Sequence, residues 1–212
     1  MYALAASAAG VGVMVLAQQA EAKIIYTKTY KHIVANVPFH LDLNHDGVSD
    51  FRLLNHASNN GESTWIWLSV HPDQPENGFQ GHNASGSGYS YASALRGGSL
   101  VRPPFLAGGG MLAAEFEPDS GSWCQKSNKY RYLGLKFEIS GRPHYGWAHL
   151  DVACVQLGIK AILTGYAYET IPNKPVITGK TRGPDVITVQ EGSLGHLARG
   201  ASEHQVTATE RK

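Results

Sequence analysis

Three runs of alternating apolar and polar residues, separated by two short turns that contain glycine, occupy residues 130–170. In the first run apolar side chains recur at every second position, beginning with Leu133 and Leu135, and this is the period of a β-strand with one buried face. The turns at residues 140–143 and 156–158 are too short to connect parallel strands. The segment therefore predicts a three-stranded antiparallel meander at the centre of an all-β fold.

The composition of the whole chain agrees with a β protein. The sequence has 24 glycines in 212 residues, and no long segment after residue 22 shows helical periodicity. The net charge is +1 and the basic residues are spread along the chain, so no nucleic-acid partner is predicted. We expect one antiparallel β-sandwich domain, jelly-roll-like, over residues 23–179, followed by a flexible tail over residues 180–212. No stable membrane span is expected in this domain.

The N-terminal segment, residues 1–22, is an apolar run that ends in Ala20-Glu21-Ala22. Small residues at positions 20 and 22 match a signal-peptidase site, and the apolar part is short and rich in Ala and Gly for a membrane span. A membrane anchor and a buried helix are the alternatives. We predict a signal peptide, and hence a protein secreted to the extracellular space or the cell surface.

Two cysteines, Cys124 and Cys154, are the only ones in the sequence. An exported chain folds in an oxidising compartment, where such a pair forms a disulfide. The bridge would tie the segment before the meander to its second strand, and closing a loop of this size adds about 3 kcal/mol of stability. Two buried free thiols are the alternative.

An oxygen-rich loop, DLNHDGVSDF, occupies residues 42–51. Oxygen side chains at relative positions 1, 3, 5 and 9, with glycine at position 6, are typical of loops that wrap a calcium ion. Position 12 is Leu53, so the loop is not an EF-hand, and it looks like the shorter calcium loops of thrombospondin-type and integrin-propeller repeats. An Asx-rich turn that binds nothing has the same composition. The predicted ligands of a structural Ca²⁺ are the side chains of Asp42, Asn44, Asp46 and Asp50 and the carbonyl of Val48.

Large aromatic residues recur on the second face of the predicted strands. The run from Thr64 to Val70, TWIWLSV, alternates tryptophans with apolar residues, and the second and third strands of the meander continue the pattern. Such rings either fill the interface between two sheets or form an exposed platform on which sugars stack. The candidate stacking residues are Trp65, Tyr145, Trp147 and Tyr166.

Carboxylates that could serve a glycan-cleaving enzyme are Glu115 and Glu117, on the predicted strand at residues 111–117, and Glu138. Two carboxyl groups facing one cleft act as acid and base in glycosidases. A solvated polar face explains the same strand pattern. The sequence has no Gly-x-Ser-x-Gly elbow, no His-Glu-x-x-His motif and no phosphate loop, so no other reaction is predicted.

Three stretches resemble a module of exported bacterial proteins that often carry a PEP-CTERM-type sorting tail: YLGLKF at 132–137, HYGWA at 144–148 and GYAYETIPN at 165–173. The resemblance is clear over residues 129–179 and weaker before them, where it includes the DxNxDGxxDF loop of residues 42–51. It implies secretion and a β fold, and it implies no catalytic activity. Residues 193–202 look like the start of such a tail, but His196 and Arg199 interrupt its apolar helix, and a disordered polar extension fits equally well.

These features together favour a secreted, non-enzymatic module that calcium and a disulfide hold rigid. Its expected partner is extracellular polysaccharide or cell-surface material. Two alternatives stay open: a glycoside hydrolase or lyase that uses paired carboxylates, and a purely structural matrix protein.

Overall fold

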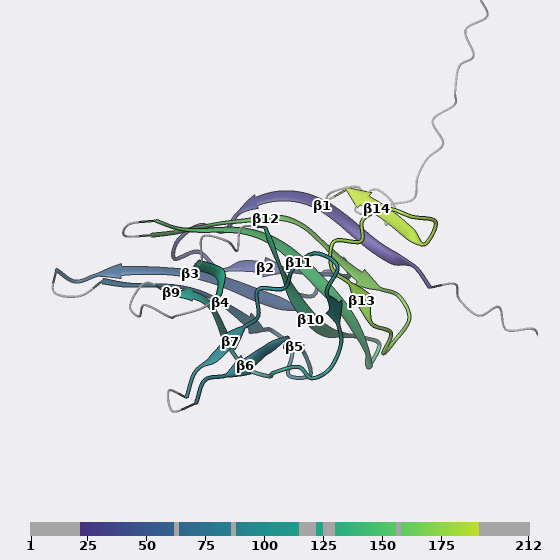
Figure 1. Cartoon of the computed structure of the whole chain (residues 1–212), viewed down its shortest axis with the longest axis horizontal. Coiled ribbons are helices and arrows are strands. Elements are labelled where there is room, and N and C mark those ends of the chain that lie inside the picture. Colours follow the sequence, from purple (N-terminus) through teal and green to yellow (C-terminus); the bar gives the residue numbers. More distant parts are fainter. Residues whose placement is uncertain are drawn as a thin grey trace, which may run out of the picture.

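Two six-stranded sheets lie face to face in the computed structural model of the chain (Figure 1). The structure describes residues 22–61, 64–85, 88–114, 122–124, 130–155 and 158–190. The signal-peptide prediction, Glu115, Glu117 and the predicted sorting tail lie outside these residues. In the part that is described there is no α-helix, and the predicted all-β sandwich is confirmed.

Sheet A contains the meander. Its strand order is β14 (Val186–Gln190), β1 (Ile24–His32), β12 (Gly158–Glu169), β11 (Arg142–Val155), β10 (Arg131–Ile139) and β5 (Gly78–Phe79). Strands β10, β11 and β12 pair antiparallel in sequence order, as predicted. The link from β10 to β11 is the pair Ser140-Gly141, both with positive φ, at 52° and 71°, which is the geometry of the tight turn that a twisted hairpin favours.

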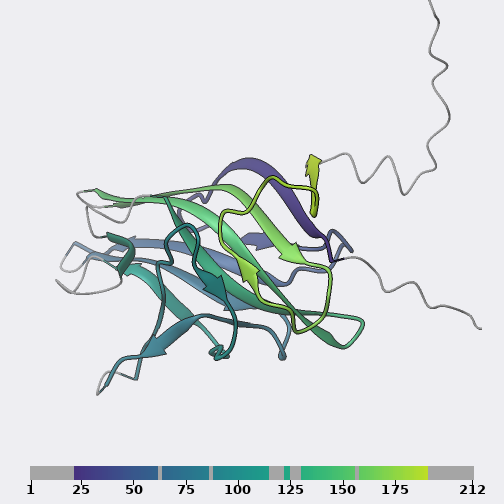
Figure 2. The ribbon, with the colours of Figure 1, turned by 45° about the vertical axis from the view of Figure 1, so that its right-hand side comes forward.

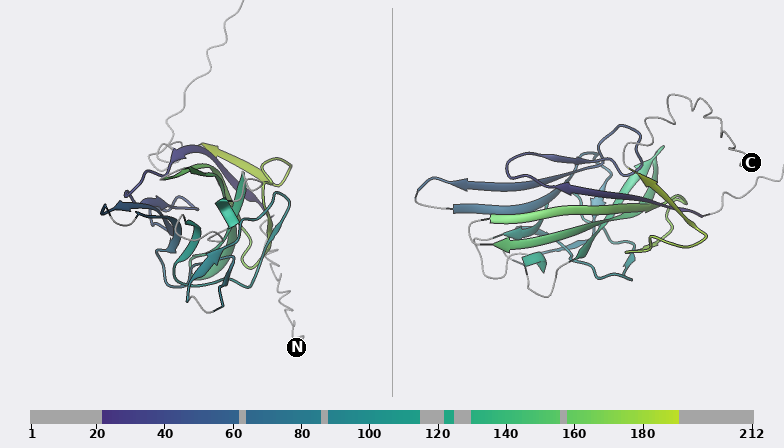
Figure 3. Two further views of the ribbon diagram at one scale, coloured as in Figure 1. Left: turned by 60° about the vertical axis from the view of Figure 1, so that its left-hand side comes forward. Right: turned by 90° about the horizontal axis from the view of Figure 1, so that it is seen from above.

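Sheet B is built from the N-terminal half of the chain. Its strand order is β2 (Phe39–Leu41), β3 (Phe51–Asn59), β4 (Thr64–Pro72), β9 (Gly110–Ala114), β7 (Ser90–Ala92) and β6 (Gly81–Asn83). Alternate residues of each strand point to the same side of the sheet, and those that point inward are apolar. On β4 these are Ile66, Leu68 and Val70, all buried. They meet Leu133, Leu135 and other residues of sheet A in one core, and Figure 3 gives this arrangement from two further sides.

A second, smaller core covers the outer face of sheet A. A two-stranded sheet of β8 (Leu100–Val101) and β13 (Val176–Ile177) lies against the meander (Figure 2). Between the two layers are packed Ile24, Val101, Tyr145, Trp147, Ala167 and Val176. The aromatic face of β11 is therefore an interior surface, because the chain folds a third layer over it.

Strand β12 departs from the uninterrupted alternation that the sequence predicts. Opposite the neighbouring pair His149 and Leu150 of β11, β12 supplies Gly165 and Leu163, so Thr164 is an extra residue. Such a bulge reverses the face on which the following side chains point. Leu163 before it and Tyr166 after it consequently both lie in the main core.

The C-terminal part of the domain extends further than predicted. The sequence placed a flexible tail from Lys180 onward, yet Val186–Gln190 pair parallel with β1, in register from Ile24 to Lys28. The ordered domain therefore reaches at least Gln190. The described ends of the chain lie at the same edge of sheet A.

The predicted disulfide between Cys124 and Cys154 is present, with the two Cα atoms 5.4 Å apart. It joins the short 3₁₀ helix η1 (Ser122–Cys124) to β11. Disulfides are characteristic of proteins that fold in an oxidising, extracellular environment. Along the described chain, no helix has the length and apolarity that crossing a membrane requires.

Candidate functional site

The outer face of sheet B carries a row of large and polar side chains along β4. Because residues 66, 68 and 70 point into the core, Trp65, Trp67, Ser69 and His71 point outward. His71 follows Trp65 by six positions along the strand, so the row is about 20 Å long at the usual rise per residue. Trp65 is 49% exposed, which is unusual for the largest apolar side chain.

A hollow of about 400 Å³ lies over this row. Its wall is completed by Tyr89 and Ser90, at the start of β7, and by Met111 of β9. Tyr89 is 50% exposed, so two large rings from separate segments border one open space. We call this hollow the aromatic groove; its volume falls in the range of small-molecule sites. None of the described residues that line it carries a carboxylate, a lysine or an arginine.

His71 forms one end of the aromatic groove. Its Nε2 and the Ser69 hydroxyl are 3.0 Å apart, and its ring lies so close to Gly109 that a Cβ there would be 2.7 Å from the ring atoms. Burial lowers the pKa of His71 below its ordinary value of 6.5, and Arg52 lowers the pKa further. The imidazole is therefore neutral at pH 7, and its two nitrogens provide one donor and one acceptor.

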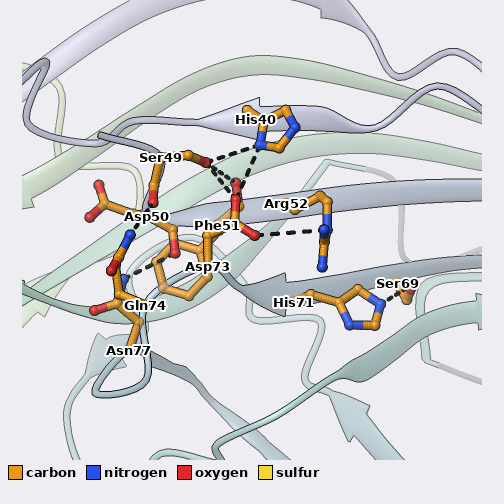
Figure 4. A network of polar contacts seen from close by, with 10 residues as sticks. All are labelled: His40, Ser49, Asp50, Phe51, Arg52, Ser69, His71, Asp73, Gln74 and Asn77. Carbon is orange, nitrogen blue, oxygen red and sulfur yellow. Dashed lines mark hydrogen bonds and ion pairs between the residues drawn. The ribbon is translucent and has the colours of Figure 1, made fainter. Parts of the chain in front are cut away.

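A polar network beside His71 fixes this end of sheet B (Figure 4). The carboxylate of Asp73 accepts a hydrogen bond from the Ser49 hydroxyl at 2.7 Å, and it contacts His40 Nδ1 at 3.1 Å and Arg52 Nε at 3.8 Å. These partners come from β2, β3 and the loop between them. The network thus joins β2, β3 and the loop between them to Asp73, directly after β4.

The oxygen-rich loop lies between β2 and β3 and is closed by its own hydrogen bonds. Asp42 accepts the backbone N–H groups of His45, at 2.6 Å, and Gly47, at 2.8 Å, and Asp46 accepts that of Val48 at 2.8 Å. Gly47 has a φ of +87°, which explains the glycine at this position. The side-chain amide of Asn44 donates to Asp46, while its carbonyl oxygen is buried and has no hydrogen-bond partner.

Asp50 ends the loop and is almost completely buried, at 5% exposed. Its carboxylate accepts the backbone N–H of Leu43 at 2.8 Å. Burial raises the pKa of Asp50 to about 7, with the negative charges of Asp42 and Asp46 adding to the rise and the Leu43 hydrogen bond opposing it. The carboxylates of Asp42 and Asp46 thus lie close enough to disfavour the charged form of Asp50.

The predicted calcium ligands are consequently in one loop. Among the described residues, no three His, Cys, Asp or Glu side chains converge as metal ligands do. Asp46, Val48 and Asp50 line a separate hollow of about 340 Å³, and Glu138 of β10 lies on its wall. Glu138, the one described member of the predicted catalytic set, therefore faces the loop and is not in the aromatic groove.

Three of the four predicted stacking residues are buried. Tyr145 is 4% exposed, Trp147 is 1% exposed and Tyr166 is 4% exposed, so they cannot form an exposed platform. The first two lie under β8 and β13, and the bulge at Thr164 turns the third into the main core. Only Trp65 remains at the surface.

Of the groove residues, sequence reasoning predicted only Trp65, and the larger side chains that it missed are Trp67, His71, Tyr89 and Met111. The alternation of TWIWLSV already places Trp67 beside Trp65 on one face. Tyr89 has no comparable signal, since its position depends on the pairing of β7 with β9, the neighbour of β4.

Comparisons with known proteins add no relative: no family model, curated protein or solved structure matches the chain. The geometry described above is therefore the basis for any functional assignment.

Proposed function

We propose that this chain is an exported, non-enzymatic binding module that takes a neutral glycan in the aromatic groove. The observation that carries the proposal is the pair of half-exposed rings, Trp65 and Tyr89, that line one open hollow. An exposed tryptophan leaves apolar surface in contact with water, which is unfavourable in the unbound protein. A ligand that covers the ring removes this surface from water and so gains binding free energy.

The lining favours carbohydrate over other small ligands. Sugar rings have apolar C–H faces and hydroxyls that both donate and accept, so they suit aromatic faces flanked by neutral polar groups. Here the neutral imidazole of His71 and the hydroxyl of Ser90 flank the rings. The absence of charged groups from the described lining favours a neutral glycan over a uronic acid or a phosphorylated ligand.

Export is supported by three independent features. The apolar N-terminal segment has a cleavage-type ending, the only two cysteines form a disulfide, and residues 129–179 resemble a module of secreted bacterial proteins. A glycan-binding role outside the cell agrees with all three.

A glycan array followed by isothermal titration calorimetry tests the binding function. The mature protein should bind at least one neutral oligosaccharide, and Trp65→Ala and Tyr89→Ala should each weaken binding about tenfold or more, in line with the loss of a stacking ring. Tyr30→Ala is the matched control, because Tyr30 is 66% exposed on β1 of the other sheet. Binding that Trp65→Ala leaves unchanged would remove the groove as the site.

The oxygen-rich loop is proposed to bind Ca²⁺ as a structural ion. Support comes from the negative charges of Asp42 and Asp46, which disfavour the charged form of Asp50, and from the carbonyl oxygen of Asn44, which has no hydrogen-bond partner. A bound cation would satisfy both. The midpoint of thermal unfolding should rise when Ca²⁺ is added to chelator-treated protein. Asp46→Asn, at an exposed position, should abolish the rise, and an equal midpoint with and without Ca²⁺ in the wild type would show that the loop is an Asx turn only.

A further inference from the structure

A second hollow of about 360 Å³ adjoins the aromatic groove on the same outer face of sheet B. Its walls are residues of β3, chiefly Leu54 and His56, and the segment Asn36–Pro38 that leads into β2. Trp67 lines both hollows. One indole ring is therefore the boundary between two spaces that are otherwise lined by different strands.

The boundary at Trp67 is a flat stack. The rings of His56 and Trp67 are parallel to within 26°, with their centroids 3.9 Å apart, because the two residues face each other across the β3–β4 pair. This contact holds the indole in one orientation, so that it offers a fixed surface to a ligand passing over it.

The far wall of the second hollow is equally well fixed. Asn36 has a φ of 60°, and its side chain donates to the Ala57 carbonyl at 2.8 Å and accepts the Ala57 N–H at 3.0 Å. Its backbone N–H also donates to the carbonyl of Asn55 at 2.7 Å. The Asn36 side chain thus makes the two hydrogen bonds that the backbone of a neighbouring strand would make. Because this wall is already ordered, a ligand that binds there loses no free energy in ordering it.

We propose that the two hollows are consecutive subsites of one elongated site, so that the ligand of this module is an extended neutral polysaccharide chain and not a terminal or isolated sugar. The proposal rests on the proposed glycan-binding function. From β9 across β4 and β3 to the segment beside Asn36 there are three strand spacings, which makes about 14 Å of continuous width. That length is filled by several linked sugar rings. Like the groove, the second hollow has no charged residue among its described lining, so a chain of identical neutral units meets the same kind of surface in both.

The test is calorimetric titration of the wild-type protein with oligosaccharide ladders from cellulose and laminarin, from the disaccharide to the hexasaccharide, alongside any neutral glycan that the array selects. Affinity should rise at least tenfold from the disaccharide to the hexasaccharide. In His56→Ala the hexasaccharide should lose most of that gain, while the disaccharide, which contacts Trp65 and Tyr89 in the groove, should lose much less affinity than the hexasaccharide.

Hydrogen exchange gives a second measurement that does not depend on a variant. The hexasaccharide should protect backbone amides around Asn36 and His56, and the disaccharide should not. Affinity that is independent of chain length, with binding still lost in Trp65→Ala, overturns the elongated site and leaves the glycan function intact. A length dependence that His56→Ala does not reduce, without protection near Asn36, also overturns it. If no saccharide binds, the proposed function itself fails.

Discussion

Removing the cross-link between Cys124 and Cys154 should lower the free energy of unfolding by about 3–4 kcal/mol, the chain-entropy value for a loop of this length. The two cysteines are 30 residues apart. That value applies when the folded state is unchanged by the loss, and other contacts hold η1 in place. Trp123 is 1% exposed and its indole N–H donates to the Ala92 carbonyl at 3.0 Å. The backbone N–H of Ala94 donates to the hydroxyl of Ser122 at 3.3 Å.

Urea unfolding of the wild type, the reduced wild type and the double variant Cys124→Ala/Cys154→Ala measures this loss. The last two should agree, and their thermal midpoints should lie about 7–15 °C below that of the oxidised protein, given the usual entropy of unfolding for a domain of this size. The reducing agent should have no effect on the double variant. A loss below about 1 kcal/mol would refute the reasoning, since the chain-entropy model allows no such small value for this loop. If the double variant were much less stable than the reduced wild type, the two cysteine side chains would also stabilise the fold by packing.

Three further predictions concern the cores and buried polar groups. Leu68→Ala should cost about 2–5 kcal/mol of unfolding free energy in chemical denaturation, because the side chain is fully buried between the sheets. Lys174→Met should cost about 1–3 kcal/mol, since it leaves Glu169, whose side chain is 3% exposed and contacts the Lys174 ammonium at 3.1 Å, without its cation; Glu169→Gln in the same background should recover part of this loss. Burial lowers the pKa of His149 below 6.5, against a smaller raising effect of Asp151, so the unfolded chain binds more protons and stability should fall as the pH drops through and below 6.5. His149→Gln should make the thermal midpoint less dependent on pH in that window, and an unchanged pH profile would contradict this assignment.

Local periodicity was sufficient to predict the strands and most of their buried faces. The alternation at Leu133 and Leu135 depends only on the pleat of a single strand, so it can be read without knowing what the strand packs against. The disulfide was predictable for a similar reason, because a chain with only two cysteines leaves one pairing.

The faces of the aromatic residues were not predictable from the same pattern. Trp147 is buried because β8 and β13, each only two residues long, cover the outer side of the meander, and strands that short have no periodicity to detect. Tyr166 is buried because one extra residue, Thr164, reverses the alternation that follows. Both outcomes depend on pairing between distant segments, which single-strand patterns do not contain.

The same third layer determines where a ligand can bind. Sheet A is covered on its inner face by sheet B, and β8 and β13 cover Tyr145 and Trp147 on its outer face, so these two rings stabilise the fold and are not accessible to a sugar. Sheet B has its inner face in the core, while its outer face keeps Trp65 at the surface. An asymmetric sandwich of this kind gives the two sheets different roles: the meander, with the disulfide at one end, provides rigidity, and β4 presents side chains to solvent. A Trp65→Arg substitution, which places a charge over the aromatic groove, should therefore abolish glycan binding. It should lower the unfolding midpoint much less than a polar substitution at Trp147 does, because Trp65 is 49% exposed and Trp147 is 1% exposed.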